Sequence, residues 1–191
     1  MLFRSKAVRA LCTERGILLM MDEVQTGFAR TGRWFGFEHF DVAPDVVTMA
    51  KGMGNGMPVG ALWARREVAG VFAPGDHGST FSGTALATSA VLATIAEMKR
   101  IDAPSRAVEQ GERLRTGLES MPSVASVRGF GLLLGAQLVD GVDAKSMQMK
   151  LLDAGLVTNA VTPTALRFAP PLNVSTDHID EALAILREVL S

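Results

Sequence analysis

The stretch TMAKGMGNGMPVGAL, residues 48–62, decides how this chain is interpreted. Its lysine, Lys51, follows a short apolar run and precedes a glycine-rich loop, residues 52–58. Strand ends form the ligand-binding cleft of an open α/β sheet, and we expect the amine to project there. A partly desolvated amine is a good nucleophile, and neighbouring glycines let a planar ligand approach the backbone closely. The alternative is a surface lysine beside a turn; a P-loop fits poorly, because its lysine follows the glycines.

The composition indicates a globular protein with a large core. The chain has 191 residues, 48% of them hydrophobic, and a formal net charge of −1. These values argue against a disordered tail and against a basic nucleic-acid-binding protein. No apolar run reaches the roughly 20 residues that a membrane span needs. The single cysteine, Cys12, cannot form an internal disulfide and indicates a reducing, cytoplasmic compartment, and no Cys/His spacing predicts a metal site.

The first hundred residues combine helices with short apolar strands. The run GILLMMDEV, residues 16–24, is continuous and apolar, which is typical of a strand buried on both faces of a parallel sheet. The other expected elements are helices over 3–15, 65–73 and 84–101, strands over 45–50 and 59–64, a loop with one helical turn over 26–44, and a polar loop over 74–83.

The remaining residues form a second α/β part, with a boundary expected near residues 101–104. Apolar residues recur at helical spacing in two segments, 104–121 and the last helix, which we expect to begin at Ser175 or Thr176. Between these helices we expect a strand pair or bent strand over 124–139, a helix over 144–154, and a strand in ALRFAPPL that ends at two prolines.

Three further sites carry candidate chemistry. Asp22 ends the first apolar run, where a carboxylate can pair with the pyridine nitrogen of pyridoxal phosphate and keep it protonated. The loop HGSTFSG, residues 77–83, offers hydroxyls and free backbone amides that suit a phosphate. Arg167 alternates with apolar neighbours and can clamp a substrate carboxylate. The alternatives are a turn aspartate, an ordinary polar loop and a strand arginine that reaches solvent.

Five ordered motifs resemble those of the class III aminotransferases. They are DEVQTGFARTG (22–32), PDVVTMAKGMGNGMPVGA (44–61), HGSTFSG (77–83), VRGFGLLLG (127–135) and LRFAPPL (166–172). The resemblance implies the type I aminotransferase fold and the cofactor pyridoxal phosphate. Residues 1–102 would be the C-terminal part of the large cofactor-binding domain, with its mainly parallel sheet, and residues 103–191 the C-terminal small α/β domain. Within the family, GLVTNAVTPTALRFAPPL is most similar to the acetylornithine aminotransferases of arginine biosynthesis.

The resemblance also implies a role for each matched residue. Lys51 would bind the cofactor covalently and move a proton during the reaction, and Asp22 would pair with the ring nitrogen. Further cofactor contacts would come from Glu23, from Val24 against one ring face, from Gln25 at the phenolic oxygen, and from Thr80 at the phosphate of the cofactor in the other subunit of a homodimer. Substrate contacts would come from Ser79, at the same interface, and from Arg167, which would hold the α-carboxylate of glutamate or 2-oxoglutarate.

Several alternatives remain open at this stage. The sequence resembles only the C-terminal half of the family's chains, so the chain is expected to be a fragment or a truncated product. Within the family, the substrate can instead be ornithine or another ω-amino acid, and the reaction a decarboxylation or an intramolecular amino shift. Outside catalysis, the chain can be an inactive remnant or a nucleotide-binding module.

Overall fold

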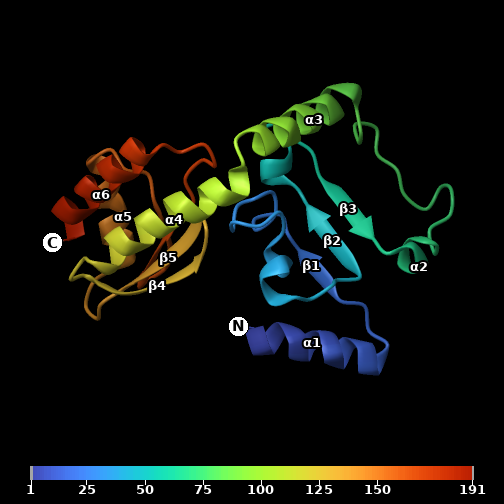
Figure 1. Ribbon diagram of the computed structural model, residues 1–191, viewed down its shortest axis with the longest axis horizontal. Helices are drawn as coiled ribbons and strands as arrows, with labels where there is room; N and C mark the ends of the chain where they lie inside the picture. Colours follow the sequence, from blue (N-terminus) through green and yellow to red (C-terminus); the bar gives the residue numbers. More distant parts are fainter. Residues whose placement is uncertain (1, 191) are drawn as a thin grey trace. The chain divides into compact units, whose positions relative to one another are not determined.

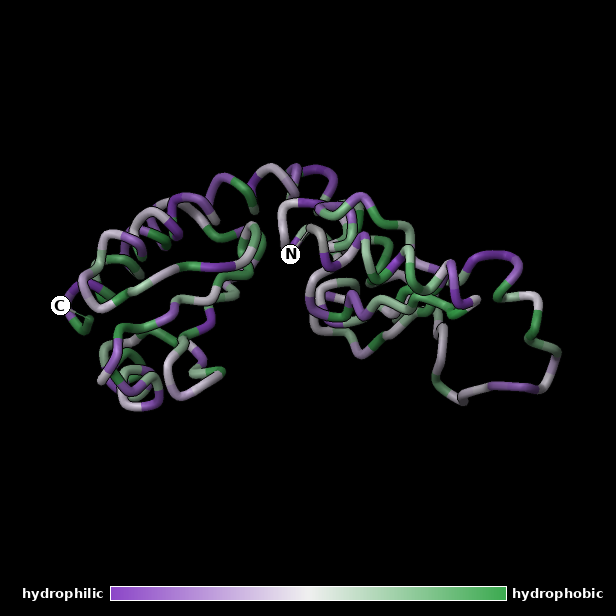
Figure 2. Tube along the Cα trace, turned by 90° about the horizontal axis from the view of Figure 1, so that it is seen from below, coloured by the Kyte–Doolittle hydropathy of each residue, from purple (hydrophilic) through white to green (hydrophobic). Residues whose placement is uncertain are grey.

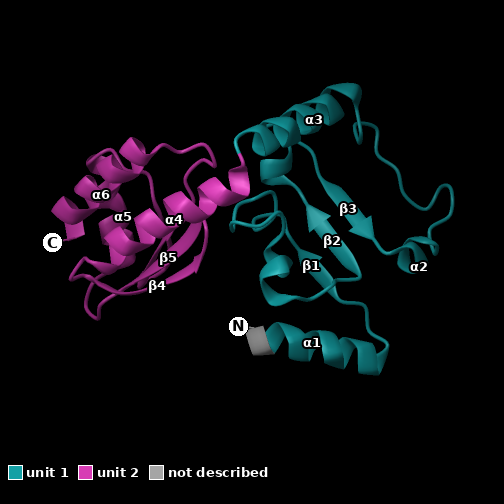
Figure 3. Cartoon of the chain, in the orientation of Figure 1, with its two compact units in different colours: residues 1–101 teal, residues 102–191 magenta. Residues whose placement is uncertain are grey.

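The computed structural model describes residues 2–190 and contains two compact units, Met1–Ile101 and Asp102–Ser191 (Figure 3). Helix α3 (Ala85–Arg100) is the last element of the first unit, and helix α4 (Ala103–Glu119) is the first of the second (Figure 1). Among the described residues, no helix is long and apolar enough to cross a membrane.

The first unit is built around a three-stranded sheet in the order β1-β2-β3. Strand β1 (Met20–Asp22) runs parallel to β2 (Val46–Met49), and β3 (Ala61–Ala64) runs antiparallel to β2. The remaining elements are helix α1 (Leu2–Arg15), the 3₁₀ turns η1 (Gly36–Phe40) and η2 (Lys51–Met53), and the short helix α2 (Arg66–Ala69). The expected helices, the two later strands and the helical turn within residues 26–44 are confirmed.

The strand expected over residues 16–24 is shorter and more exposed than its sequence indicates. Strand β1 covers only residues 20–22, and Ile17, Leu18 and Met20 are 56%, 48% and 59% exposed. The prediction of a strand buried on both faces is therefore wrong for this chain. In the described part of the chain β1 is an edge strand that pairs with β2 alone, so residues with the pattern of a central strand lie at the surface.

A buried carboxylate joins α1 to the sheet of the first unit. Asp45, directly before β2, is only 3% exposed. Its Oδ2 accepts hydrogen bonds from Arg9 Nη1 and from the Leu19 amide, each at 2.7 Å, and its Oδ1 lies 2.8 Å from Arg65 Nε. Asp45 therefore fixes one face of α1, the start of β2 and the end of β3 to one another.

The second unit is a four-stranded antiparallel sheet with three helices on one side (Figure 1). The strand order is β4 (Val124–Phe130), β5 (Leu133–Leu138), β7 (Ala165–Phe168) and β6 (Asn159–Thr162). The helices are α4, α5 (Ala144–Asp153) and α6 (Thr176–Leu190). The expected strand pair, the strand that ends at the prolines and all three helices are confirmed.

The core of the second unit follows the apolar stripes of its helices. The apolar side chains on one face of α4 and of α6 are buried against the sheet and against each other. They are Ala107, Leu114 and Leu118 on α4, and Ile179, Leu183, Leu186 and Leu190 on α6. Gly111 permits the close approach of α4 to the β4–β5 turn, because a Cβ there would lie 2.1 Å from the carbonyl oxygen of Gly131. This unit therefore has a continuous apolar core of its own.

A long loop, residues 70–84, connects α2 with α3 and extends away from the sheet of the first unit (Figure 1). Hydrophobic and hydrophilic stretches follow one another along it (Figure 2). Every residue of the loop is exposed, although Val71, Phe72 and Phe81 are large and apolar, with exposures of 75%, 54% and 83%. These three apolar side chains therefore lie at the surface of the described chain.

Candidate active site

Two strand ends bring polar side chains together at one edge of the first sheet. Asp22, the last residue of β1, pairs with Thr48 of β2 in the parallel register. Paired residues of neighbouring strands project to the same face of a sheet, so these two side chains share a face. Lys51 begins the turn η2 just beyond β2. The register of two short strands thus gathers the carboxylate and the lysine that the sequence analysis selected.

The carboxylate of Asp22 is oriented by two hydrogen-bond donors. The backbone amide of Val24 donates to Asp22 Oδ1 at 3.0 Å, and the Thr48 hydroxyl donates to the same oxygen at 3.2 Å. The second oxygen, Oδ2, accepts no hydrogen bond from the described residues. The side chain is exposed, so Oδ2 is available to a ligand.

The amine of Lys51 is held by Gln25. Lys51 Nζ donates a hydrogen bond to Gln25 Oε1 at 2.6 Å. The backbone of Lys51 has a φ of 43°, an unusual value for a residue with a side chain, and such strained conformations concentrate at functional sites. Lys51 is nevertheless exposed. The expected desolvation of its amine is therefore absent in the described chain.

The glycine-rich loop forms an open hollow beside the lysine. The hollow has a volume of about 460 Å³ and is lined by Lys51, Gly52, Asn55, Gly56, Met57, Pro58 and Val59. Gly54 lies beneath it, where a Cβ would approach both the Met57 carbonyl oxygen and Val59 Cγ1 to 2.5 Å. The glycines therefore have two separate effects. Gly52 and Gly56 leave space in the hollow for a ligand, and Gly54 lets the loop fold back on itself.

Glu23 is part of the loop's framework. Its side chain is 3% exposed, and its carboxylate accepts hydrogen bonds from the amides of Gly36 and Phe37 at 2.9 and 2.8 Å and from the Thr26 hydroxyl. These bonds occupy both oxygens. Glu23 thereby fixes the segment that carries Val24 and Gln25, and any contribution of its carboxylate to cofactor binding is indirect.

The remaining expected site residues lie apart from this cluster. Ser79 and Thr80 lie in the exposed 70–84 loop, and within the described chain no hydrogen bond joins them to Lys51 or Asp22. Arg167 lies on β7 of the second unit and is exposed. Its register partners are Gly135 on β5 and Asn159 on β6. Gly135 has no side chain, and the side chain of its other register partner, Arg128, lies over it, with Cγ and Nε at 3.6 and 3.7 Å from where a Gly135 Cβ would stand.

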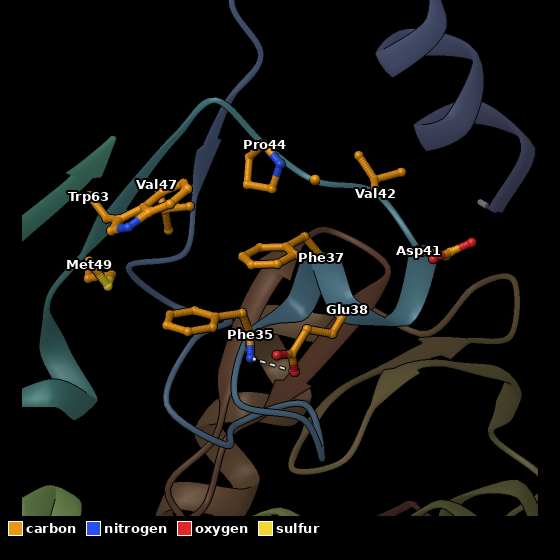
Figure 4. A pocket seen from close by; sticks show the side chains of 10 residues that line it. Phe35, Phe37, Glu38, Asp41, Val42, Pro44, Val47, Met49 and Trp63 are labelled. Atoms are coloured by element: carbon orange, nitrogen blue, oxygen red, sulfur yellow. Dashed lines mark hydrogen bonds between the residues drawn. The ribbon is translucent and has the colours of Figure 1, made fainter. Parts of the chain in front are cut away.

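A second cavity of about 650 Å³ lies on the opposite face of the first sheet (Figure 4). Val47 and Trp63 are register partners that line it, and residues next to each other in a strand face opposite sides, so Thr48 and Asp22 point away from it. The stacked rings of Phe35 and Phe37, 5.4 Å apart, form its other wall. This apolar cavity contains neither Lys51 nor Asp22 and is not the site of the proposed chemistry.

Thr48 is the residue at this site that the sequence analysis missed. Its hydroxyl contacts Asp22, although 26 positions separate the two residues. The signal was present in the quoted stretch, which begins at this threonine. Finding it required the parallel register of β1 with β2, since a shift by one residue would turn the hydroxyl to the other face.

This chain is similar to known proteins along nearly its whole length. The chain matches the family profile described as aminotransferase class-III over residues 4–190. It is 46% identical over 190 residues to the acetylornithine aminotransferase of Caldanaerobacter subterraneus subsp. tengcongensis, a match that covers 97% of this chain and 48% of that protein. The chain thus spans about half the length of the curated relatives it matches.

Solved structures share the fold. The ornithine aminotransferase from Toxoplasma gondii aligns with a TM-score of 0.90 at 31% identity, covering 97% of this chain and 46% of that one. The acetylornithine aminotransferase from Elizabethkingia anophelis aligns with a TM-score of 0.87 at 32% identity, covering 97% and 48%. The expected type I aminotransferase fold is confirmed. The chain therefore belongs to the class III aminotransferase family, whose cofactor is pyridoxal phosphate.

Proposed function

We propose that this chain is part of an enzyme that transfers the ω-amino group of N-acetylornithine to 2-oxoglutarate in arginine biosynthesis. The observation that carries the reaction type is the cluster of Asp22, Gln25 and Lys51 at one sheet edge. The choice of N-acetylornithine rests on sequence similarity. Two curated acetylornithine aminotransferases are 46% and 41% identical to this chain.

The donor set of this edge fits pyridoxal phosphate. A carboxylate with one oxygen free of partners suits a protonated ring nitrogen, and a primary amine suits an aldehyde. The open hollow beside Lys51 leaves room for a planar ring. When bound, the cofactor supplies an electron sink for cleavage of a bond at the substrate's amino-bearing carbon.

Each residue of the cluster has its own proposed role in binding the cofactor or in moving a proton. Lys51 would hold the cofactor covalently, and its amine would accept and return the proton that moves during transamination. Gln25 holds the amine from 2.6 Å and thereby sets its direction. Asp22 would accept a hydrogen bond from the ring nitrogen and keep that nitrogen protonated. Val24, whose amide donates to Asp22 Oδ1, would lie against one face of the ring.

Arg167 is the proposed contact for the substrate's carboxylate. A guanidinium presents two parallel donors to a carboxylate, which fixes both position and orientation. The side chain is exposed, and within the described chain it takes part in no ion pair. Glutamate and 2-oxoglutarate carry the α-carboxylate that such a group recognises.

The functional assembly is proposed to be a homodimer in which the 70–84 loop reaches the partner's site. The exposed apolar residues Val71, Phe72 and Phe81 support this part of the proposal, because they would be covered by a second subunit. Thr80 would then bind the phosphate of the cofactor in the partner, and Ser79 would lie near the substrate. Both residues are in the exposed part of the loop.

A donor panel tests the proposed substrate. The purified chain is incubated with pyridoxal phosphate, 2-oxoglutarate and, separately, N-acetylornithine, ornithine and 4-aminobutyrate, and glutamate formation is measured. We expect N-acetylornithine to be the fastest donor by about tenfold, the order of discrimination that buried substrate contacts provide. A faster reaction with ornithine would contradict the substrate, and no glutamate from any donor would contradict catalysis by this chain alone.

A further inference from the structure

The carboxylate of Asp22 is held from one side only. Two donors, the Val24 amide at 3.0 Å and the Thr48 hydroxyl at 3.2 Å, converge on Oδ1. A carboxylate is planar, so rotation about its bond to the side chain would break both hydrogen bonds. Fixing Oδ1 therefore also fixes the direction of Oδ2, the oxygen that no described residue contacts.

The Thr48 hydroxyl is itself held by the strand. Thr48 is the register partner of Asp22 in the β1–β2 ladder, and its carbonyl oxygen accepts the amide of Glu23 at 2.9 Å. A β-branched side chain has few allowed rotamers. The hydroxyl therefore keeps its place relative to Asp22 without depending on solvent or on a flexible loop.

We propose that Thr48 is a positioning residue that aims the free oxygen of Asp22 at the ring nitrogen of pyridoxal phosphate. The inference rests on the proposed function, since it assigns a task within the same site. Charge-assisted hydrogen bonds depend on geometry, and a group that is already oriented loses less conformational freedom when the ligand binds. Removal of the hydroxyl leaves an exposed carboxylate that must be ordered during binding.

Three variants separate the hydroxyl from the shape of the side chain. Thr48→Val keeps the branched shape and removes the hydroxyl, whereas Thr48→Ser keeps the hydroxyl and removes the methyl group. Thr94→Val is the matched control, because the Thr94 hydroxyl donates only to the Ala90 carbonyl oxygen of its own helix, at 2.8 Å. Only Thr48→Val is expected to change the behaviour of Asp22.

The first readout needs no cofactor. The amide of Val24 donates to Asp22 Oδ1, and we expect this bond to slow its hydrogen exchange as long as the carboxylate is fixed. In the full chain we expect Thr48→Val to accelerate exchange at Val24 about fivefold, with Thr48→Ser and Thr94→Val near the wild-type rate. An unchanged exchange rate in Thr48→Val would overturn the proposal.

The second readout is the affinity for pyridoxal phosphate, measured by fluorescence titration. We expect Thr48→Val to raise Kd about three- to tenfold, the range that the net contribution of one ordinary hydrogen bond converts to, and Thr48→Ser to restore it. In an Asp22→Ala background Thr48→Val should cause no further loss, because the residue through which Thr48 acts is gone. An equal loss in that background would overturn the proposal by showing a merely structural role.

The two readouts also separate this inference from the proposed function. If the wild-type chain binds no pyridoxal phosphate, the proposal that this chain contains a cofactor site is contradicted. The exchange rate of Val24 would then still decide whether Thr48 orients Asp22. Binding by the wild type together with an unchanged Kd in Thr48→Val would leave the proposed function standing and overturn the role of Thr48.

Discussion

At the scale of single residues, the site depends on side chains that organise the backbone as much as on those that face a ligand. Glu23 is buried, and both of its carboxylate oxygens accept hydrogen bonds from loop amides. In its neighbour Asp22, only Oδ1 accepts hydrogen bonds from the described residues. Two adjacent acids therefore have opposite tasks. The difference follows from what each side chain meets, since Asp22 ends β1 and faces Thr48, whereas Glu23 lies just beyond the strand and meets the amides of Gly36 and Phe37.

Gly54 provides a direct test of the loop beside Lys51. A methyl group there would lie 2.5 Å from the backbone oxygen of Met57, which cannot move without opening the loop. We expect Gly54→Ala to lower the free energy of unfolding by about 1–3 kcal/mol, the usual cost of overpacking, as measured by urea denaturation. Gly78→Ala is the control, since a Cβ there meets nothing within 4 Å. Equal effects of the two substitutions would refute the steric explanation.

At the scale of elements, Asp45 makes the attachment of α1 sensitive to pH. Hydrogen bonds from Arg9 and from the Leu19 amide hold the pKa of the Asp45 carboxyl below its ordinary value. Because the folded-state pKa is depressed, the stabilisation is fully present above the ordinary aspartate pKa of about 3.9 and is lost as pH falls through the lowered value.

The pH dependence is measurable as a difference between two proteins. We expect Asp45→Asn to be less stable than the wild type near neutral pH, and the gap in free energy of unfolding to narrow once pH falls below about 4. Denaturant titrations across that range check this. A gap that stays constant down to the lowest pH would show that the Asp45 charge does not stabilise the attachment of α1.

Arg115 protects the open edge of the second sheet. Its guanidinium donates to the carbonyl oxygens of Val127 and Gly129 at 3.0 and 2.8 Å, on the outer edge of β4, where no strand follows in the described chain. We expect Arg115→Met, which keeps the apolar stem, to lower the free energy of unfolding by about 1–2 kcal/mol for two lost hydrogen bonds. Arg113→Met, which breaks an exposed ion pair with Asp180, should lower the free energy of unfolding by less. A larger loss in Arg113→Met than in Arg115→Met would contradict the proposed role of Arg115 at the edge of β4.

At the scale of the whole molecule, the two units differ in how completely they bury their apolar residues. The buried cluster runs from Ala107 to Leu190 and lies wholly in the second unit. The first unit leaves Leu62, Leu86 and Leu92 exposed by 56%, 69% and 70%. A unit that exposes this much apolar surface is expected to depend on further protein to cover it.

This contrast predicts different behaviour of the separated units. We expect residues 102–191 to unfold in one cooperative transition, because they contain a complete core. Residues 1–101 should bind a hydrophobic dye and self-associate. Calorimetry, dye binding and light scattering check this. A second unit that melts without cooperativity, or a first unit that is monomeric and does not bind the dye, would contradict the account.

The sequence predicted those features that depend on local periodicity and on short motifs. The stripes of α4 and α6, the α3 helix, the strand end at Asp22 and the strand before Lys51 follow from the residues themselves. It could not predict the exposure of β1, since burial depends on which chain segments cover a strand. Nor could it predict that Thr48 contacts Asp22 or that Glu23 binds two distant amides, because register and loop path are tertiary properties.

The most direct test of the central claim is reductive trapping of the cofactor. The full chain is incubated with pyridoxal phosphate, reduced with borohydride and digested, and pyridoxyl adducts are located by mass spectrometry. We predict one dominant adduct, on Lys51, which disappears in Lys51→Arg and persists in the control Lys99→Arg, whose side chain is on the exposed face of α3. Adducts scattered over surface lysines, with a yield that Lys51→Arg leaves unchanged, would contradict the claim that this strand edge is a cofactor site.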